Sequence, residues 1–195
     1  MVVDARRGAA GWSRRSFLRG AGITFVGGAP VLLAACGGGD DESAKPKPRS
    51  ADVDVLNTAL DVEYTAVAVY TAGEPVLRGR TRALGREFLD QEREHAAALV
   101  RAIEDLGGTP NKPRKHYATP PLPDQDAFLT FARDLENTAV AAYIDALPKL
   151  SHPQLRATAA AILTIEAEHL SLLLAALDEP RVPEAFVTGT LAVGE

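Results

Sequence analysis

Two short acidic segments that each end in a histidine carry side chains able to do chemistry. Glu166-Ala167-Glu168-His169 lies inside an apolar run, and Glu92-Arg93-Glu94-His95 repeats the same pattern earlier in the chain. Two further glutamates precede these segments by 29 and 30 residues. Carboxylate and imidazole groups are ligands that divalent metals accept. The pattern therefore gives six candidate metal ligands: Glu63, Glu92, His95, Glu136, Glu166 and His169.

Four amphipathic segments position these residues, because apolar side chains recur in each segment at steps of three and four residues. Ser50 and Ser151 are the expected N-caps of the first and fourth helices. The connection between the second and third helices is rich in proline and longer than most bundle loops. The helices are expected at residues 50–73, 77 or 81–106, 124–147 and 151–177.

The two halves of this helical region repeat each other. Residues 63–70 align with residues 136–143 at a shift of 73, and the two Glu-x-Glu-His segments align at a shift of 74. A duplicated pair of helices predicts two hairpins that associate. The expected fold class is therefore all-α, an antiparallel four-helix bundle built from two duplicated hairpins.

Each candidate ligand falls within an apolar stripe, and a histidine three residues after a glutamate lies about 60° from it around the helix. An uncompensated buried carboxylate costs several kcal/mol. Protonation, basic partners or metal ions could compensate it, but no Lys or Arg falls in the stripes. Two divalent cations would nearly neutralise four carboxylates. Metal binding is the favoured hypothesis, and a buried polar network left from a metal-binding ancestor is the alternative.

Other polar residues near the candidate ligands have simpler interpretations. Glu94 and Glu168 point away from the stripes and are expected to be solvated or hydrogen-bonded to a neighbour. Tyr70 and Tyr143 lie two turns beyond Glu63 and Glu136 on the same helix faces. These tyrosines could hydrogen-bond a ligand or donate an electron to an oxidised metal. The alternative is a core tyrosine with a satisfied hydroxyl.

The six-residue pattern resembles the ligand set of ferritin-like di-metal bundles, in which two helices each give one Glu and the other two each give Glu-x-x-His. The resemblance is closest to the ferritin-like domain family that includes plant desiccation-related proteins. It covers about residues 51–187. Four further segments support it, at residues 60–64, 106–110, 141–143 and 183–186.

This resemblance implies a role for each candidate ligand. Glu92 and Glu166 would bridge two metal ions, and Glu63 and Glu136 would be terminal ligands. The two histidines would each cap one ion. The implied cofactor is a pair of divalent iron or manganese ions, and the ligands do not decide between these metals.

The resemblance also implies a class of function. One expectation is an oxidoreductase with ferroxidase or peroxide-detoxifying activity. The alternatives are a non-catalytic metal-binding or stress-protection protein, and a partner-binding bundle with a relic site. No cysteine set for a rubredoxin-like electron donor is present. The sequence therefore identifies no electron donor and no protein partner. It is also compatible with a homodimer.

The first fifty residues are typical of an export signal. Arg14-Arg15 followed by Phe17-Leu18 resembles the twin-arginine signal. The apolar stretch that follows is too short for a good membrane-spanning helix. It ends at Cys36 in a sequence that resembles a bacterial lipoprotein box, although an ordinary signal with a chance cysteine is the alternative. The expected organisation is a signal peptide (1–35), a lipidated cysteine and tether (36–50), the bundle (51–187) and a tail (188–195).

Charge and cysteine usage narrow the location and the partners. The net charge is −5, which argues against nucleic-acid binding. The single cysteine excludes an internal disulfide framework and a zinc-thiolate site. We therefore expect a protein that is exported across the bacterial cytoplasmic membrane and held at the cell envelope through a lipid on Cys36.

Overall fold

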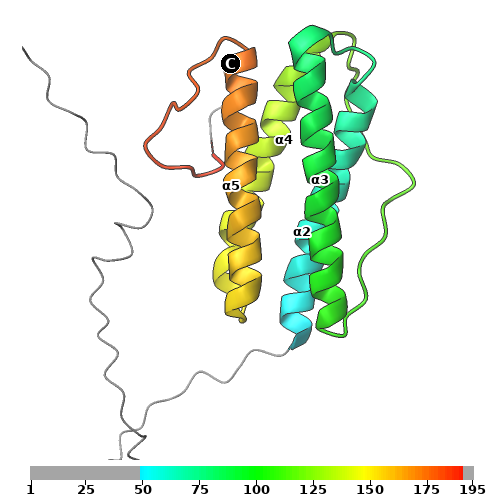
Figure 1. The fold of residues 1–195 in the computed structure, drawn as a ribbon, viewed down its shortest axis with the longest axis vertical. Helices are drawn as coiled ribbons and strands as arrows, with labels where there is room; N and C mark the ends of the chain where they lie inside the picture. Colours follow the sequence, from blue (N-terminus) through cyan, green and yellow to red (C-terminus); the bar gives the residue numbers. More distant parts are fainter. Residues whose placement is uncertain (1–48, 191–195) are drawn as a thin grey trace, which may run out of the picture. The chain divides into compact units, whose positions relative to one another are not determined.

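Four long helices make up most of the chain that the computed structural model describes, residues 49–190 (Figure 1). No strand occurs among these residues. The predicted all-α four-helix architecture is therefore confirmed. The predicted export signal, Cys36 and residues 191–195 lie outside the described residues. The elements are α2 (Arg49–Gly73), α3 (Gly79–Asp105), α4 (Gln125–Ala146), the 3-10 turn η1 (Leu147–Lys149) and α5 (Pro153–Ala176).

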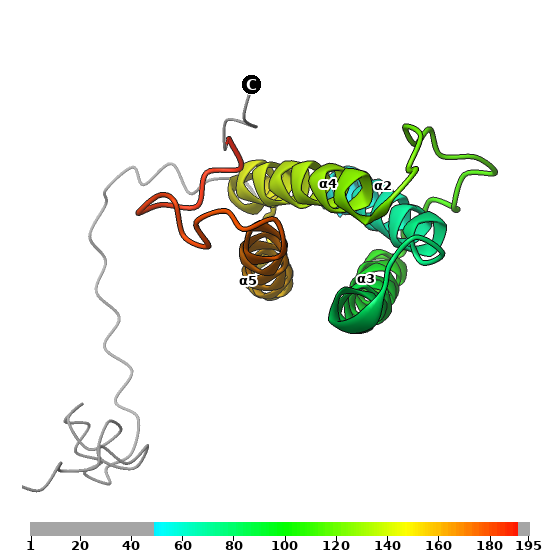
Figure 2. The same cartoon turned by 90° about the horizontal axis from the view of Figure 1, so that it is seen from above.

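The helices associate as two hairpins, as the sequence repeat predicts. Helix α2 packs mainly on α3, and α4 packs mainly on α5. The hairpins meet where α2 contacts α4, and Figure 2 shows these two helices side by side, with α5 below α4 and α3 below α2. The long connection after α3 is fixed to α2 through Asn57, whose Nδ2 donates to Thr109 O at 3.1 Å. The Oδ1 atom of Asn57 accepts from Asn111 N at 2.7 Å.

Two of the predicted helix starts are wrong, and both errors involve the same end of the bundle. Ser50 is not an N-cap, because α2 already includes Arg49. The N-cap of α5 is His152 and not Ser151, because both residues turn toward α2. Ser151 N donates to Asp52 Oδ1 and His152 Nδ1 lies by Asp52 Oδ2, each at 2.7 Å. The start of α4 agrees with its prediction, because Asp124 caps it.

The core has two apolar clusters, one on each side of the level that carries the candidate ligands. The first cluster includes Leu60, Leu99 and Ile162, and it is mostly aliphatic. The second includes Tyr70, Phe88 and Phe128. Helix α5 is long and apolar enough to cross a membrane by length and composition. It nevertheless packs on α4 and presents a buried acid and a buried histidine to the core, which is the pattern of a central bundle helix.

Candidate metal centre

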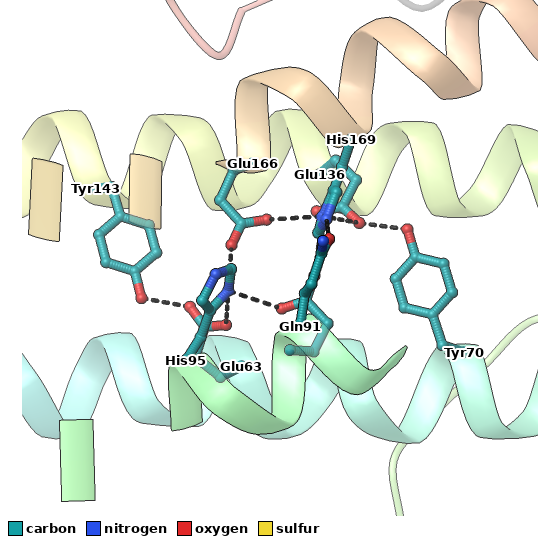
Figure 3. Close-up of polar contacts among 9 residues, drawn as sticks. Glu63, Tyr70, Gln91, His95, Glu136, Tyr143, Glu166 and His169 are labelled. Carbon is teal, nitrogen blue, oxygen red and sulfur yellow. Dashed lines mark hydrogen bonds and ion pairs between the residues drawn. The ribbon is translucent and has the colours of Figure 1, made fainter. Parts of the chain in front are cut away.

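The structure brings the six predicted ligands together in the middle of the bundle. Each of the four helices contributes, since α2 and α4 each give one glutamate, and α3 and α5 each give a glutamate and a histidine (Figure 3). All four glutamates are at most 1% exposed. The His169 side chain is 2% exposed and the His95 side chain is 12% exposed. The 3.6-residue helical period places each histidine beside the glutamate three residues before it.

The six residues form two overlapping groups of potential ligand atoms. Glu63 and His95 make up one group with Glu92 and Glu166. Glu136 and His169 make up the other group with the same two glutamates. Within each group the ligand atoms lie within 4.8 Å of one another. Glu92 and Glu166 are therefore shared by both groups, in the position that a bridging carboxylate occupies.

Both histidines face the carboxylates through Nδ1. The Nδ1 atom of His95 lies 3.0 Å from Glu166 Oε1 and 3.4 Å from Glu63 Oε2. The Nδ1 atom of His169 lies 3.1 Å from Glu92 Oε1 and 3.6 Å from Glu136 Oε1. Each imidazole therefore points the same ring nitrogen toward the centre of the cluster.

Two buried tyrosines hold the outer glutamates in a reciprocal arrangement. Tyr70 on α2 donates from its hydroxyl to Glu136 Oε1 on α4. Tyr143 on α4 donates in the same way to Glu63 Oε1 on α2. Both tyrosines are 1% exposed. The sequence left open whether these tyrosines hydrogen-bond a ligand or are core residues with a satisfied hydroxyl. Both descriptions apply, because each is a core tyrosine whose hydroxyl donates to a candidate ligand.

Most buried polar atoms without a hydrogen-bond partner in the described chain belong to this cluster. Outside it, the only such side-chain atom among residues 51–190 is Ser151 Oγ. Native proteins leave few buried polar groups unpaired, so a concentration of them calls for an explanation. These atoms are oxygen and imidazole nitrogen donors that converge on one region, and they fit a pair of divalent cations. They are Glu63 Oε2, Glu136 Oε2, both carboxylate oxygens of Glu92 and Glu166, and Nδ1 of His95 and His169.

Burial and mutual contact divide the glutamates into two classes. Burial raises the pKa of Glu63 and of Glu136 well above the usual value, although the nearby histidines oppose this shift. Burial also opposes the charge on Glu92 and Glu166, but ion-pair contacts with both histidines outweigh it. The pKa of Glu92 is lowered, and that of Glu166 falls to about 2. Contact with the histidines thus favours the ionised form of the inner pair, and burial favours the protonated form of the outer pair.

The histidines supply the balancing positive charge. Burial opposes protonation of His95, but ion-pair contacts with three glutamates raise its pKa to about 12. The same competition raises the pKa of His169 to about 11. Two imidazolium groups therefore face the two carboxylates of the inner pair, and their charges offset each other.

No lysine or arginine among residues 51–190 pairs with the six residues. The one buried arginine, Arg133, makes ion pairs with Asp134 and Glu179 instead. Glu94 and Glu168 are exposed, as expected. Sequence reasoning missed Gln91, whose Oε1 lies 2.7 Å from His169 Nε2, and Phe88, whose ring stacks on the same imidazole. Position 91 directly precedes a ligand, but a glutamine at the edge of a stripe resembles an ordinary surface residue.

The family model described as the ferritin-like domain matches residues 51–179. The chain belongs to the ferritin-like domain family. The match covers nearly all of α2, the whole of α3, α4 and α5, and the six candidate ligands. The predicted family is therefore confirmed, whereas the predicted export signal lies outside the matched region.

Solved structures share the ferritin-like fold. A ferritin-like, diiron-carboxylate protein from Bacillus anthracis str. Ames is 24% identical with a TM-score of 0.58, over 67% of this chain and 98% of its own. A conserved hypothetical protein from Mycobacterium tuberculosis is 21% identical with a TM-score of 0.63. The alignment covers 66% of this chain and 98% of that protein. The dodecameric thioferritin of Bacteroides fragilis, a bacterioferritin-related protein, is 27% identical with a TM-score of 0.60. The alignment covers 67% of this chain and 86% of that protein. Comparison with curated proteins gave no match.

Proposed function

We propose that this protein binds a dinuclear iron or manganese centre and uses it for redox chemistry as a ferroxidase or a peroxide-detoxifying oxidoreductase. The observation that carries the proposal is the set of buried carboxylate and imidazole atoms that converge without hydrogen-bond partners. Their two groups share Glu92 and Glu166, which suits two adjacent ions. A bound pair of such ions supplies electrons for the reduction of dioxygen or peroxide.

The side chains around the centre have separate tasks in this proposal. Glu63 and His95 would hold one ion, and Glu136 and His169 would hold the other. Tyr70 and Tyr143 fix the outer glutamates, since each donates a hydrogen bond to the carboxylate on the opposite hairpin. The apolar clusters on both sides bury the four glutamates and His169. The diiron-carboxylate description of the Bacillus anthracis protein supports iron as one of the two candidate metals.

The location is a further part of the proposal. The twin-arginine pattern at Arg14-Arg15 and the lipoprotein box ending at Cys36 support export and lipid anchoring at the cell envelope. An exported chain would meet peroxide and metal ions outside the cytoplasm. Electrons for repeated turnover would come from a partner that the sequence does not identify.

A second candidate function is a metal-free or non-catalytic bundle for stress protection or partner binding. The charge balance of the cluster favours it, because two imidazolium groups compensate two carboxylates without any metal. The buried network would then be a relic that serves the fold alone. The two functions differ in whether the chain holds metal and whether that metal turns over.

Elemental analysis of the full chain, purified in detergent with its native metals, separates these functions. We expect close to two iron or manganese ions per chain, followed by oxidation of added ferrous iron or consumption of added peroxide. Two bound ions without turnover would favour a non-catalytic metal-binding protein. If no metal binds even after anaerobic reconstitution, the dinuclear proposal is wrong.

A further inference from the structure

The two ends of the candidate centre are built differently, although the hairpins that form it are repeats. At the shift of 74 that aligns the two ligand segments, Gln91 corresponds to Ile165 and Phe88 corresponds to Ile162. Both differences fall on side chains next to the histidines. The repeat therefore reproduces the ligands but not their immediate supports.

On one side, the His169 imidazole is held at both ring nitrogens. Its Nδ1 atom faces Glu92 at 3.1 Å, and its Nε2 atom lies 2.7 Å from Gln91 Oε1. An imidazole that binds a metal through Nδ1 carries its proton on Nε2, and that N–H then donates to the Gln91 amide oxygen (Figure 3). Gln91 therefore fixes both the tautomer and the ring orientation that a metal ligand needs.

The same imidazole is also enclosed by aromatic rings. Phe88 stacks on His169 with a centroid separation of 3.9 Å and an interplanar angle of 25°. Tyr70 packs edge-on against Phe88 at 5.8 Å, which continues the aromatic wall. Behind this wall the His169 side chain is 2% exposed.

The His95 imidazole has neither support. Within residues 49–190, no hydrogen bond reaches its Nε2 atom. Its Nδ1 atom lies near three glutamates, and its ring lies 6.4 Å from that of His169. Ile165, which corresponds to Gln91, has no polar atom on its side chain. Ile162, which corresponds to Phe88, belongs to the aliphatic cluster. The His95 side chain is 12% exposed, so this end of the centre is the one that solvent reaches.

We propose that the two metal positions are unequal, with the position at His169 filled first and held more tightly. The position at His95 would exchange its ion and receive external reactants. This inference rests on the proposed function, since it requires a centre that binds two ions. Gln91 acts through His169 and is a positioning residue. Loss of such an outer hydrogen bond typically weakens metal binding by roughly 10–100-fold.

The test separates the two positions by removing one histidine at a time from the full chain. Anaerobic titration with Co²⁺ would measure the affinity of His95→Ala, which retains the position at His169, and of His169→Ala, which retains the other. Gln91→Leu is then added to each. We expect a roughly 10–100-fold loss of affinity in the His95→Ala chain and a change within about 2-fold in the His169→Ala chain.

Two further variants separate positioning from a general structural effect. Gln91→Glu keeps an acceptor oxygen near Nε2 and should restore most of the lost affinity. Ile165→Leu changes the corresponding position on the other hairpin and should leave the Co²⁺ affinities of both metal positions unchanged. In the otherwise native chain, Gln91→Leu should bring the two stepwise dissociation constants for Co²⁺ closer together. This provides a second measurement if a histidine variant does not fold.

The outcomes distinguish this inference from the proposal on which it rests. A parent chain that binds no Co²⁺, Mn²⁺ or Fe²⁺ would overturn the proposed function and the inequality with it. If the parent binds two ions and Gln91→Leu lowers both affinities equally, or neither, only the inequality is overturned. A selective loss at the His169 position, restored by Gln91→Glu, supports it.

Discussion

A carboxylate buried between helices needs a partner for each oxygen, and the outer glutamates obtain one from a tyrosine. Burial and the adjacent glutamates raise the pKa of both tyrosines well above the usual value, so each phenol remains a donor. Tyr143→Phe removes the donor to Glu63 and should lower the free energy of unfolding by about 1–3 kcal/mol. Denaturant unfolding of the metal-free chain measures this change.

The control for that variant is Tyr64→Phe. Tyr64 is partly exposed on α2, and no hydrogen bond to its hydroxyl occurs within residues 49–190. It should change the free energy of unfolding by no more than about 0.5 kcal/mol. Equal effects of Tyr64→Phe and Tyr143→Phe would show that the hydrogen bond to Glu63 contributes nothing specific.

The protonation of the cluster predicts a second observable. Metal ligation requires neutral imidazoles and ionised carboxylates. At neutral pH both histidines are protonated in the metal-free chain, and burial also favours the protonated forms of Glu63 and Glu136. Loading two divalent ions should therefore release about two protons from the histidines, together with any proton held by the two outer glutamates. Calorimetric titration in buffers with different ionisation enthalpies counts them, and release near zero would contradict this protonation pattern.

At the residue scale, the sequence predicts the six cluster residues because acids and histidines interrupt apolar stripes. It does not predict Gln91, because a neutral amide between charged neighbours carries no such contrast. Nor does it predict buried Arg133, whose charge is satisfied by Asp134 and by Glu179, a residue 46 positions away. Contacts of this kind depend on how the helices are placed and not on any local pattern.

At the scale of the helix, the apolar period predicts each element well and its exact start less well. The start of α5 depends on Asp52, which is separated from Ser151 by 99 positions. Asp52 is fully buried and accepts from Ser151 N while it contacts His152. A local capping rule cannot include a partner from another helix. The contact ties α2 to the beginning of α5.

Substitution of Asp52 tests this tie between helices. Asp52→Ala leaves the Ser151 N–H without its acceptor and should lower the free energy of unfolding by about 1–3 kcal/mol. Asp52→Asn retains an acceptor oxygen and should lose less. Metal affinity should not change in either variant, because Asp52 is not among the cluster residues. Thermal or denaturant unfolding and a metal titration provide the two measurements.

The exposed Asp54 on the same turn of α2 is the matched control. Asp54→Ala removes the same charge near the same helix end and should change stability by no more than about 0.5 kcal/mol. A loss equal to that of Asp52→Ala would assign the effect to helix-end charge and not to the contact between α2 and α5.

At the scale of the whole molecule, duplication gives a site that neither hairpin holds alone. Each hairpin contributes half of the cluster, and each tyrosine crosses to a glutamate of the other hairpin. The internal repeat in the sequence predicts that two hairpins associate, but it does not predict that each tyrosine reaches the other hairpin. It does not predict the unequal supports of the two histidines, because these arise where the repeats have diverged. The metal-free bundle still has a balanced cluster, so we expect it to fold without metal.

The last prediction separates metal binding from folding in the whole protein. Glu92→Ala combined with Glu166→Ala removes both shared carboxylates and should abolish the binding of two ions. The helices should remain, because His95 still lies beside Glu63 and His169 still lies beside Glu136, so neither imidazole loses every acidic neighbour. Far-UV circular dichroism and elemental analysis measure the two properties on the same sample.

Added metal should also affect the stability of the parent and the double variant differently. A ligand that binds only the folded state stabilises it by about 2.7 kcal/mol at a concentration of 100 Kd. The parent melting temperature should therefore rise with added Mn²⁺, while that of the double variant should not. Glu94→Ala combined with Glu168→Ala removes the same number of charges from exposed positions and should behave like the parent. A Glu92/Glu166 double variant that still holds two ions as tightly as the parent would place the metal elsewhere.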